Sequence, residues 1–157
     1  MKKLAISILS MMATVLFMVG CGDIEGSSNG PFDGLWQLTQ IDSVESGVSH
    51  RVIEKQVYWS VQGSLLEMRD HLLADGNGHY AVFFKFEFNG DSLHISKPVI
   101  NDRRISDREP EQSETAVYGI QYLGESFLVN RLTSKQMVLE TCRQESRDNV
   151  RMYFRKY

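Results

Sequence analysis

Short runs in which apolar and polar residues alternate are the feature that most limits the folds open to this chain. The clearest run spans residues 79–88, where every second side chain is a large aromatic or aliphatic one: Tyr80, Val82, Phe84, Phe86 and Phe88. Successive side chains of a β-strand point to opposite faces, so this spacing places all five on one face. The run follows Asp75-Gly76-Asn77-Gly78, the strongest turn signal of the chain. The pattern predicts a strand with one buried face.

Comparable strand-length runs recur as far as the C-terminus, which predicts about eight strands. In chain order they span residues 34–42, 57–61, 65–70, 79–88, 92–96, 126–133, 136–142 and 150–157. Successive hairpins with one buried and one wet face form an antiparallel meander, and an open meander of this length exposes edges that promote aggregation. We therefore predict an all-β fold, an up-and-down meander closed into a small barrel of about eight strands.

Two segments interrupt the strand pattern. Residues 101–114 hold eight charged side chains and a proline, which is typical of an exposed, mobile loop. Residues 115–123 are too apolar for a loose loop. They form either a short helix that closes one end of the barrel or an extra strand, and we favour the closing element.

The first twenty residues have the organisation of an export signal. A basic start, Met1-Lys2-Lys3, precedes a nearly uncharged run over residues 4–19, shorter than the ~20 residues of a transmembrane helix. Met18-Val19-Gly20-Cys21 resembles the bacterial lipobox, with Met18 where Leu is usual. The resemblance implies cleavage before Cys21 and attachment of three acyl chains to the new N-terminus, enough for stable anchoring. A plain cleavable signal with a coincidental cysteine is the alternative.

These features predict three parts: a lipoprotein signal peptide at 1–20, a flexible Gly/Ser-rich linker at 21–31 after lipidated Cys21, and a barrel domain at 32–157. Gly22 follows Cys21 in place of the Asp that is often linked to inner-membrane retention. We therefore expect a lipid anchor in the outer membrane, with the domain facing either the periplasm or the cell surface.

Net charge limits the kinds of partner that this chain can bind, and the cysteine count limits its disulfides. Removal of Lys2 and Lys3 with the leader lowers the formal net charge from −3 to −5, which argues against nucleic acid. Lipidation of Cys21 leaves Cys142 alone, so no intramolecular disulfide is expected. Cys142 ends a strand-like run, and we expect a small buried hydrophobe there; a reactive or intermolecular thiol is the alternative.

The sequence contains no convincing catalytic set. Its histidines, His50, His71, His79 and His94, lack metal-ligand spacing, although His79 and His94 could form a pair across neighbouring strands. Asp70-His71 has no Ser or Cys nucleophile in a recognisable elbow. We therefore expect no enzyme activity, no metal and no cofactor.

Gly34-x-Trp36 on the first strand, the meander, and the final Tyr153-Phe154-Arg155-Lys156-Tyr157 together resemble the lipocalin-like domains of bacterial lipoproteins of the Bacteroidetes type. The resemblance covers residues 32–157. It implies that Trp36 packs at the closed end of the barrel, under a basic side chain from a late strand. Arg151, Arg155 and Arg131 are the candidates for that side chain.

Five aromatic residues would line or fill the interior: Trp36, Trp59, Tyr80, Phe84 and Phe86. As pocket residues they would make the protein an envelope lipoprotein that binds a small hydrophobic ligand. As simple core residues they would leave a filled barrel, a non-enzymatic accessory lipoprotein that docks an envelope protein partner. The volume of the interior distinguishes the two hypotheses.

Overall fold

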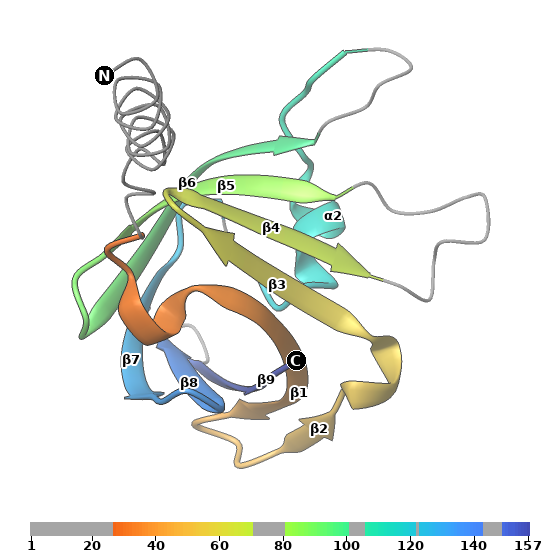
Figure 1. Cartoon of the computed structure of the whole chain (residues 1–157). Coiled ribbons are helices and arrows are strands. Elements are labelled where there is room, and N and C mark those ends of the chain that lie inside the picture. The colour runs from red at the N-terminus through yellow and green to blue at the C-terminus, as the bar shows by residue number, and fades with distance from the viewer. Residues whose placement is uncertain (1–26, 71–80, 101–105, 122, 143–148) are drawn as a thin grey trace, which may run out of the picture.

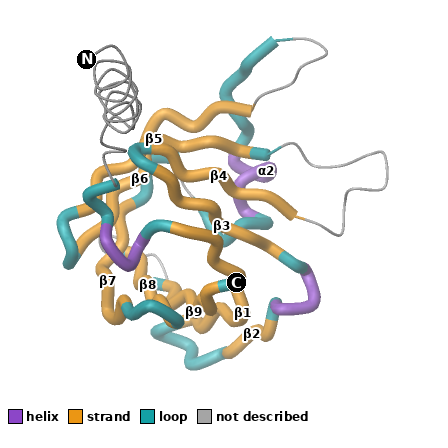
Figure 2. The backbone as a smooth tube through the Cα atoms, viewed as in Figure 1, coloured by secondary structure: helices purple, strands orange, loops and turns teal. Residues whose placement is uncertain are grey.

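A computed structural model describes residues 27–70, 81–100, 106–121, 123–142 and 149–157, and these residues form one antiparallel sheet (Figure 1). The predicted leader, its lipobox and Cys21 lie outside the described residues. The strands are β1 (Gly34–Ser43), β2 (Ser49–Arg51), β3 (Val57–Gln62), β4 (Leu65–Asp70), β5 (Val82–Phe88), β6 (Ser92–Ile100), β7 (Ser126–Leu132), β8 (Gln136–Thr141) and β9 (Val150–Lys156). Three short helices accompany them, η1 (Gly30–Phe32), η2 (Ile53–Lys55) and α2 (Gln112–Ala116) (Figure 2).

The sheet closes into a barrel in meander order. Each strand from β3 to β9 pairs with the next, β3 pairs with the first half of β1, and β9 pairs with β1 along its length. The short β2 pairs with residues 40–42 of β1, further along that strand than β3. Eight strands therefore close the barrel, and the predicted all-β up-and-down fold is confirmed.

Tight turns connect β3 to β4 and β5 to β6. Gln62 pairs with Leu65 across a two-residue connection, in which Gly63 has a positive φ of 59°. In the β5–β6 turn, the side chain of Asn89 accepts hydrogen bonds from the backbone N–H groups of Asp91 (3.2 Å) and Ser92 (2.9 Å). The turn predicted at residues 75–78 lies outside the described residues.

One end of the barrel is closed by η1 and Trp36. The indole Nε1 of Trp36 donates to the carbonyl oxygen of Phe32 at 2.7 Å, and the Phe32 ring packs against Phe86 and Phe88. Lys156 lies over the indole, with Nζ 4.9 Å from a ring centroid, and donates to the carbonyl oxygen of Asp33 at 2.6 Å.

Gly34 makes room for this lysine. Its φ of 118° is a conformation that L side chains rarely adopt, and a Cβ there would lie 2.7 Å from Cε of Lys156. The Gly-x-Trp spacing therefore has a steric reason: the glycine lets the lysine cover the tryptophan.

The prediction that Arg151, Arg155 or Arg131 covers Trp36 is wrong. Along β9, Val150, Met152 and Phe154 point inward, and Lys156 continues this face. Arg151 and Arg155 occupy the alternate positions and contact Glu140 and Gln37, respectively, while Arg131 bonds Gln136.

The opposite side of the barrel is closed by α2 and the turn after it (Figure 1). Tyr118 and Ile120 are fully buried, and the carbonyl oxygen of Tyr118 accepts a hydrogen bond from Nε1 of Trp59 at 3.2 Å. Gly119, at φ 89°, packs so closely that a Cβ would lie 2.6 Å from Sδ of Met152. The described residues of the 115–123 segment thus form the closing element that we favoured.

The prediction of an exposed loop over residues 101–114 is wrong at the C-terminal end of that segment. Gln112 begins α2, and a capping box joins Glu111 and Glu114 at the start of the helix. Arg108 pairs with Ile100 as an isolated β-bridge and donates to the carboxylate of Glu114 at 2.8 Å. Capping, which charge counting does not reveal, orders these residues.

Cys142 is exposed, so the expectation of a buried thiol is wrong. The inward positions of β8 are Met137, Leu139 and Thr141, and Cys142 follows on the outer face. Partial burial nevertheless raises the pKa of its thiol, which disfavours the reactive thiolate.

In the part of the chain that the structure describes, no helix combines the length and the apolar character needed to cross a bilayer.

We expect Phe32→Ala to lower the free energy of unfolding by about 3–5 kcal/mol, because it removes a buried ring that closes the barrel. Urea unfolding followed by circular dichroism measures the change. Leu128→Ala, at a 48% exposed position, is the matched control and should stay within about 0.5 kcal/mol of wild type. Equal effects of the two substitutions would contradict a closing role for Phe32.

Candidate functional site

The predicted ligand-contacting aromatic residues lie in the core wherever the structure describes them. Trp36 and Trp59 are paired across β1 and β3 and are both 0% exposed. Phe84 and Phe86 point inward from β5 and are 0% and 8% exposed. Tyr80 lies outside the described residues. The structure brings four of the five together, and their role as ligand contacts stays a prediction.

Aromatic packing fills the space between the strands. The ring of Trp59 lies 4.8 Å from that of Phe154 and 6.1 Å from that of Phe127, measured between centroids. At the η1 end, the ring of Phe32 lies 4.7 Å from that of Phe88. An eight-stranded barrel is just wide enough for side chains to fill, and these rings occupy that width.

The polar groups of the interior are already paired. Both indole N–H groups donate to backbone carbonyl oxygens, those of Phe32 and Tyr118. Among the described residues, no buried side-chain nitrogen or oxygen lacks a hydrogen-bond partner. Burial, with the nearby charges of Asp70 and Glu114, raises the pKa of Tyr118 to about 12, so its hydroxyl stays neutral. The described interior therefore offers no unpaired group to orient a ligand.

An open groove of about 1040 Å³ lies instead on the outside of the barrel, over β1, β7, β8 and β9. Its centre consists of alternate, outward-facing residues of two paired strands: Gln136 opposite Arg155, Val138 opposite Tyr153, and Glu140 opposite Arg151. The alternation that points Met137, Leu139, Met152 and Phe154 into the core sets these polar side chains on the outer face.

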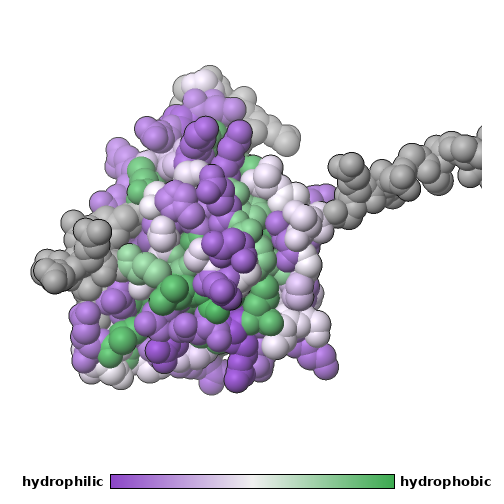
Figure 3. Space-filling view, turned by 90° about the vertical axis from the view of Figure 1, so that its left-hand side faces the viewer, coloured by the Kyte–Doolittle hydropathy of each residue, from purple (hydrophilic) through white to green (hydrophobic). Residues whose placement is uncertain are grey.

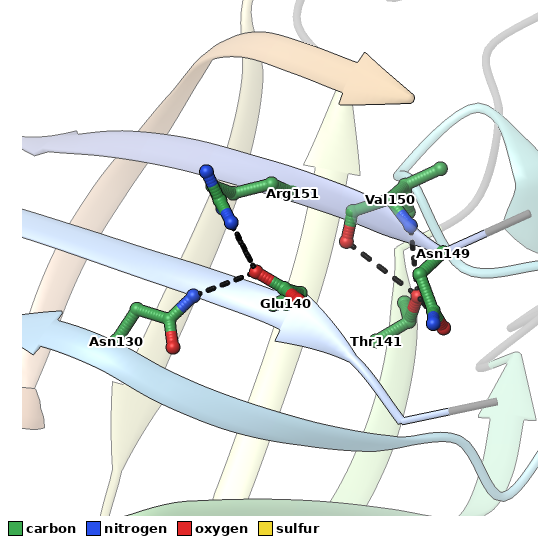
Figure 4. Close-up of polar contacts among 6 residues, drawn as sticks. All are labelled: Asn130, Glu140, Thr141, Asn149, Val150 and Arg151. Carbon is green, nitrogen blue, oxygen red and sulfur yellow. Dashed lines mark hydrogen bonds and ion pairs between the residues drawn. The ribbon is translucent and has the colours of Figure 1, made fainter. Parts of the chain in front are cut away.

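Glu140 and Arg151 form an ion pair at one end of the groove (Figure 4). Nε and Nη2 of Arg151 donate to Oε2 of Glu140 at 2.9 and 2.7 Å, and the amide of Asn130 donates to the same oxygen at 2.8 Å. The Arg151 hydrogen bonds, aided by Asn130, lower the pKa of Glu140 against the effect of burial. The same contact raises the pKa of Arg151, so both groups are charged at neutral pH.

Asp42 of β1 is paired with Arg151 and adds a second carboxylate beside this end of the groove. Partial burial pushes its pKa upward, but hydrogen bonds from Ser49, Gln40 and Tyr153, together with the charge of Arg151, outweigh burial and lower the pKa. Arg151 therefore lies between two carboxylates.

The other end of the groove carries two arginines on neutral partners. Nε and Nη2 of Arg155 donate to Oε1 of Gln37 at 2.9 and 2.7 Å. Nη1 of Arg131 donates to Oε1 of Gln136 at 3.2 Å. Amide oxygens satisfy hydrogen bonds but do not neutralise charge, so this end of the groove is cationic.

The groove is not predicted from the sequence, because its lining residues come from four strands, three of them far from β1 in the chain. The alternation of Arg151, Tyr153 and Arg155 with inward residues was a usable signal for one polar face. That β1 and β7 complete the groove follows from barrel closure.

The described residues of the remaining candidates add no further site. His94 places Nδ1 2.9 Å from Oγ of Ser126, and its proposed partner His79 lies outside the described residues. Within the described ranges, no group of three or more His, Cys, Asp or Glu side chains could hold a metal ion. The side on the left of Figure 1 interleaves apolar and hydrophilic residues (Figure 3), as protein surfaces commonly do.

Comparison with known proteins gives a consistent picture of the fold. Residues 15–157 match a family model described as a lipocalin-like domain. A lipocalin-like protein from Bacteroides uniformis superposes with a TM-score of 0.56 at 19% identity, over 82% of this chain and 100% of that one. An uncharacterized protein from Bacteroides eggerthii superposes with a TM-score of 0.54 at 18% identity, over 80% and 98%. At such identities the structures support the fold alone.

One curated protein also matches part of the chain. A succinate–CoA ligase (ADP-forming) subunit beta from Solibacter usitatus is 24% identical over 81 residues, which are 52% of this chain. The chain spans 21% of that protein's length, and a match this short and distant carries no argument about activity.

We expect Glu140→Gln to lower the free energy of unfolding by roughly 0.2–1 kcal/mol at neutral pH, the range of partly exposed ion pairs. The pKa of Glu140 in the folded protein lies below its ordinary value of 4.5, so the stabilisation is present above pH 4.5. It is lost as the pH falls through the lowered value. Urea unfolding of variant and wild type at neutral pH and at successively lower acidic pH should show a difference that shrinks as the pH falls.

Glu87→Gln, at an exposed position of β5, is the control and should show no comparable difference at neutral pH. A Glu140→Gln effect that persists unchanged in acid would contradict the ion-pair assignment.

Proposed function

Since this chain belongs to the lipocalin-like domain family, we propose that it is a non-enzymatic accessory lipoprotein of the cell envelope, with a filled barrel that docks an envelope protein partner through its outer surface. The observation that carries this proposal is the packed interior. Trp36, Trp59 and Phe84 are fully buried, and both indole N–H groups are paired within the protein.

The closed ends support the same conclusion. A ligand that entered the interior would have to displace either Phe32 or Tyr118, which are 1% and 0% exposed. Displacing Tyr118 would also break the hydrogen bond from Trp59 to its carbonyl oxygen. The side chains that line the outer groove, by contrast, are accessible to a partner without any rearrangement.

The anchor belongs to the proposal as well. A lipid on Cys21 would hold the protein at the outer membrane, and the Gly/Ser-rich residues before η1 would let the domain stand off from the bilayer. A tethered domain meets partners in the same membrane at a high effective concentration, so a modest contact surface suffices.

We expect the wild-type protein to sediment with membranes in its host, and Cys21→Ser to move to the soluble envelope fraction because it has no thiol to receive the diacylglycerol. Membrane fractionation followed by immunoblotting measures the distribution. Cys142→Ser is the matched control, since it removes the other cysteine and should leave the protein on the membrane. Membrane retention of Cys21→Ser would reject the lipid anchor.

Tryptophan emission tests the filled interior, because the two tryptophans of the chain, Trp36 and Trp59, both lie in the core. We expect no saturable quenching when the neutral apolar fluorophore N-phenyl-naphthylamine is added, since the packed rings leave it no site. Native mass spectrometry of the Cys21→Ser form, purified from its host, should show the protein mass without a non-covalent adduct.

Saturable quenching, or an adduct that disappears on denaturation, would reject the filled barrel. Either result would favour the second candidate, an envelope lipoprotein that binds a small hydrophobic ligand.

A further inference from the structure

We infer that the groove over β1, β7, β8 and β9 binds an acidic segment of the partner protein, with carboxylates of that segment at Arg131 and Arg155. The inference rests on the proposed function, in which the outer surface docks a protein. The groove residues supply the chemical class of the partner segment.

The distribution of charge in the groove carries the first step. Glu140 and Asp42 both lie near Arg151, so the acidic groups gather at one end. At the other end, the hydrogen bonds of Arg131 and Arg155 go to the uncharged amides of Gln136 and Gln37. The chain has a formal net charge of −3, so this cationic site is opposite in sign to the protein's net charge. Such a site favours a partner that presents acidic groups at this position.

The spacing of the two arginines suits an extended polypeptide. Gln136 pairs directly with Arg155 across β8 and β9, and Arg131 reaches Gln136 from β7. The two arginines stand on strands separated by β8, and Arg131 is opposite Val138, two residues along β8 from Gln136. Two strand spacings of ~4.8 Å and this offset of ~7 Å put their backbones roughly 12 Å apart. Acidic residues two apart in an extended peptide have Cα atoms ~7 Å apart, and their side chains cover the remainder.

The closed sheet decides how such a segment is recognised. β8 pairs with β7 and β9, and β9 pairs with β8 and β1, so the backbone groups of the groove floor are already used. A partner cannot add a strand here and must be recognised by side chains. Tyr153 and Val138 form the floor between the charged ends, and Arg and Tyr are the residue types that dominate binding at protein interfaces.

The test measures fluorescence anisotropy of labelled hexaglutamate, hexalysine and hexaserine with the full-length lipoprotein in a neutral detergent. We expect hexaglutamate alone to bind, and added salt to weaken its binding because salt screens exposed charges. The double substitution Arg131→Met with Arg155→Met should weaken binding about tenfold or more. Arg131→Lys with Arg155→Lys keeps both charges and should retain part of the binding.

The matched control is Arg69→Met with Lys85→Met, which removes two positive charges from outward positions of β4 and β5. We expect it to bind hexaglutamate as wild type does. Equal weakening in both double variants, or no binding of hexaglutamate by the wild type, would overturn the inference. Displacement of hexaglutamate by an equal concentration of inorganic phosphate would also overturn it, because a simple anion would then suffice.

The peptide-binding test and the test of the proposed function can fail independently. Tryptophan emission reports on ligand binding in the interior, whereas peptide anisotropy reports on binding in the outer groove. Unquenched tryptophan with no hexaglutamate binding rejects the acidic segment and leaves the filled-barrel proposal standing.

Discussion

Pairing between β1 and β9 is the constraint on which the rest of this structure depends. The two strands are hydrogen-bonded from Trp36 opposite Lys156 to Ser43 opposite Val150, and the hydroxyl of Thr39 adds a bond to the carbonyl oxygen of Tyr153. Without this ladder, β1 and β9 would both be open edges of a long meander, which favours association with other chains. With it, the first and last described strands become neighbours, and both the covered tryptophan and the outer groove form at their junction.

Closure also explains how the described core residues pack against one another. The barrel brings Trp36 and Trp59 side by side, and segments outside the strands supply the two ends, with Phe32 before β1 and Tyr118 between β6 and β7. Each end accepts one indole N–H on a backbone carbonyl oxygen. The tryptophans therefore serve both packing and closure.

Among the described residues, the polar side chains that could bind a partner lie on the outer face. The strands that bury Met137, Leu139 and Met152 present Glu140, Arg151 and Arg155 on their other face. One arginine is neutralised by carboxylates, and two are held on amide oxygens that fix their direction without cancelling their charge. The proposed partner site thus follows from the same alternation that builds the core.

Local pattern determined much of this protein from its sequence alone. Strand positions and buried faces follow from spacing over a few residues, because side-chain direction in a strand is a local property. The apolar content of residues 115–123 favoured a closing element over a loose loop. The sequence did not predict helix capping at Glu111, because charged residues alone suggest a loop. It also did not predict that Cys142 is exposed, because the inward neighbour, Thr141, is polar and gives no apolar signal. Only the tertiary structure decided that Lys156 covers Trp36 and that Arg131 and Arg155 share a groove. Those contacts join strands whose adjacency arises from barrel closure, and no period within one strand encodes which distant strand lies beside it.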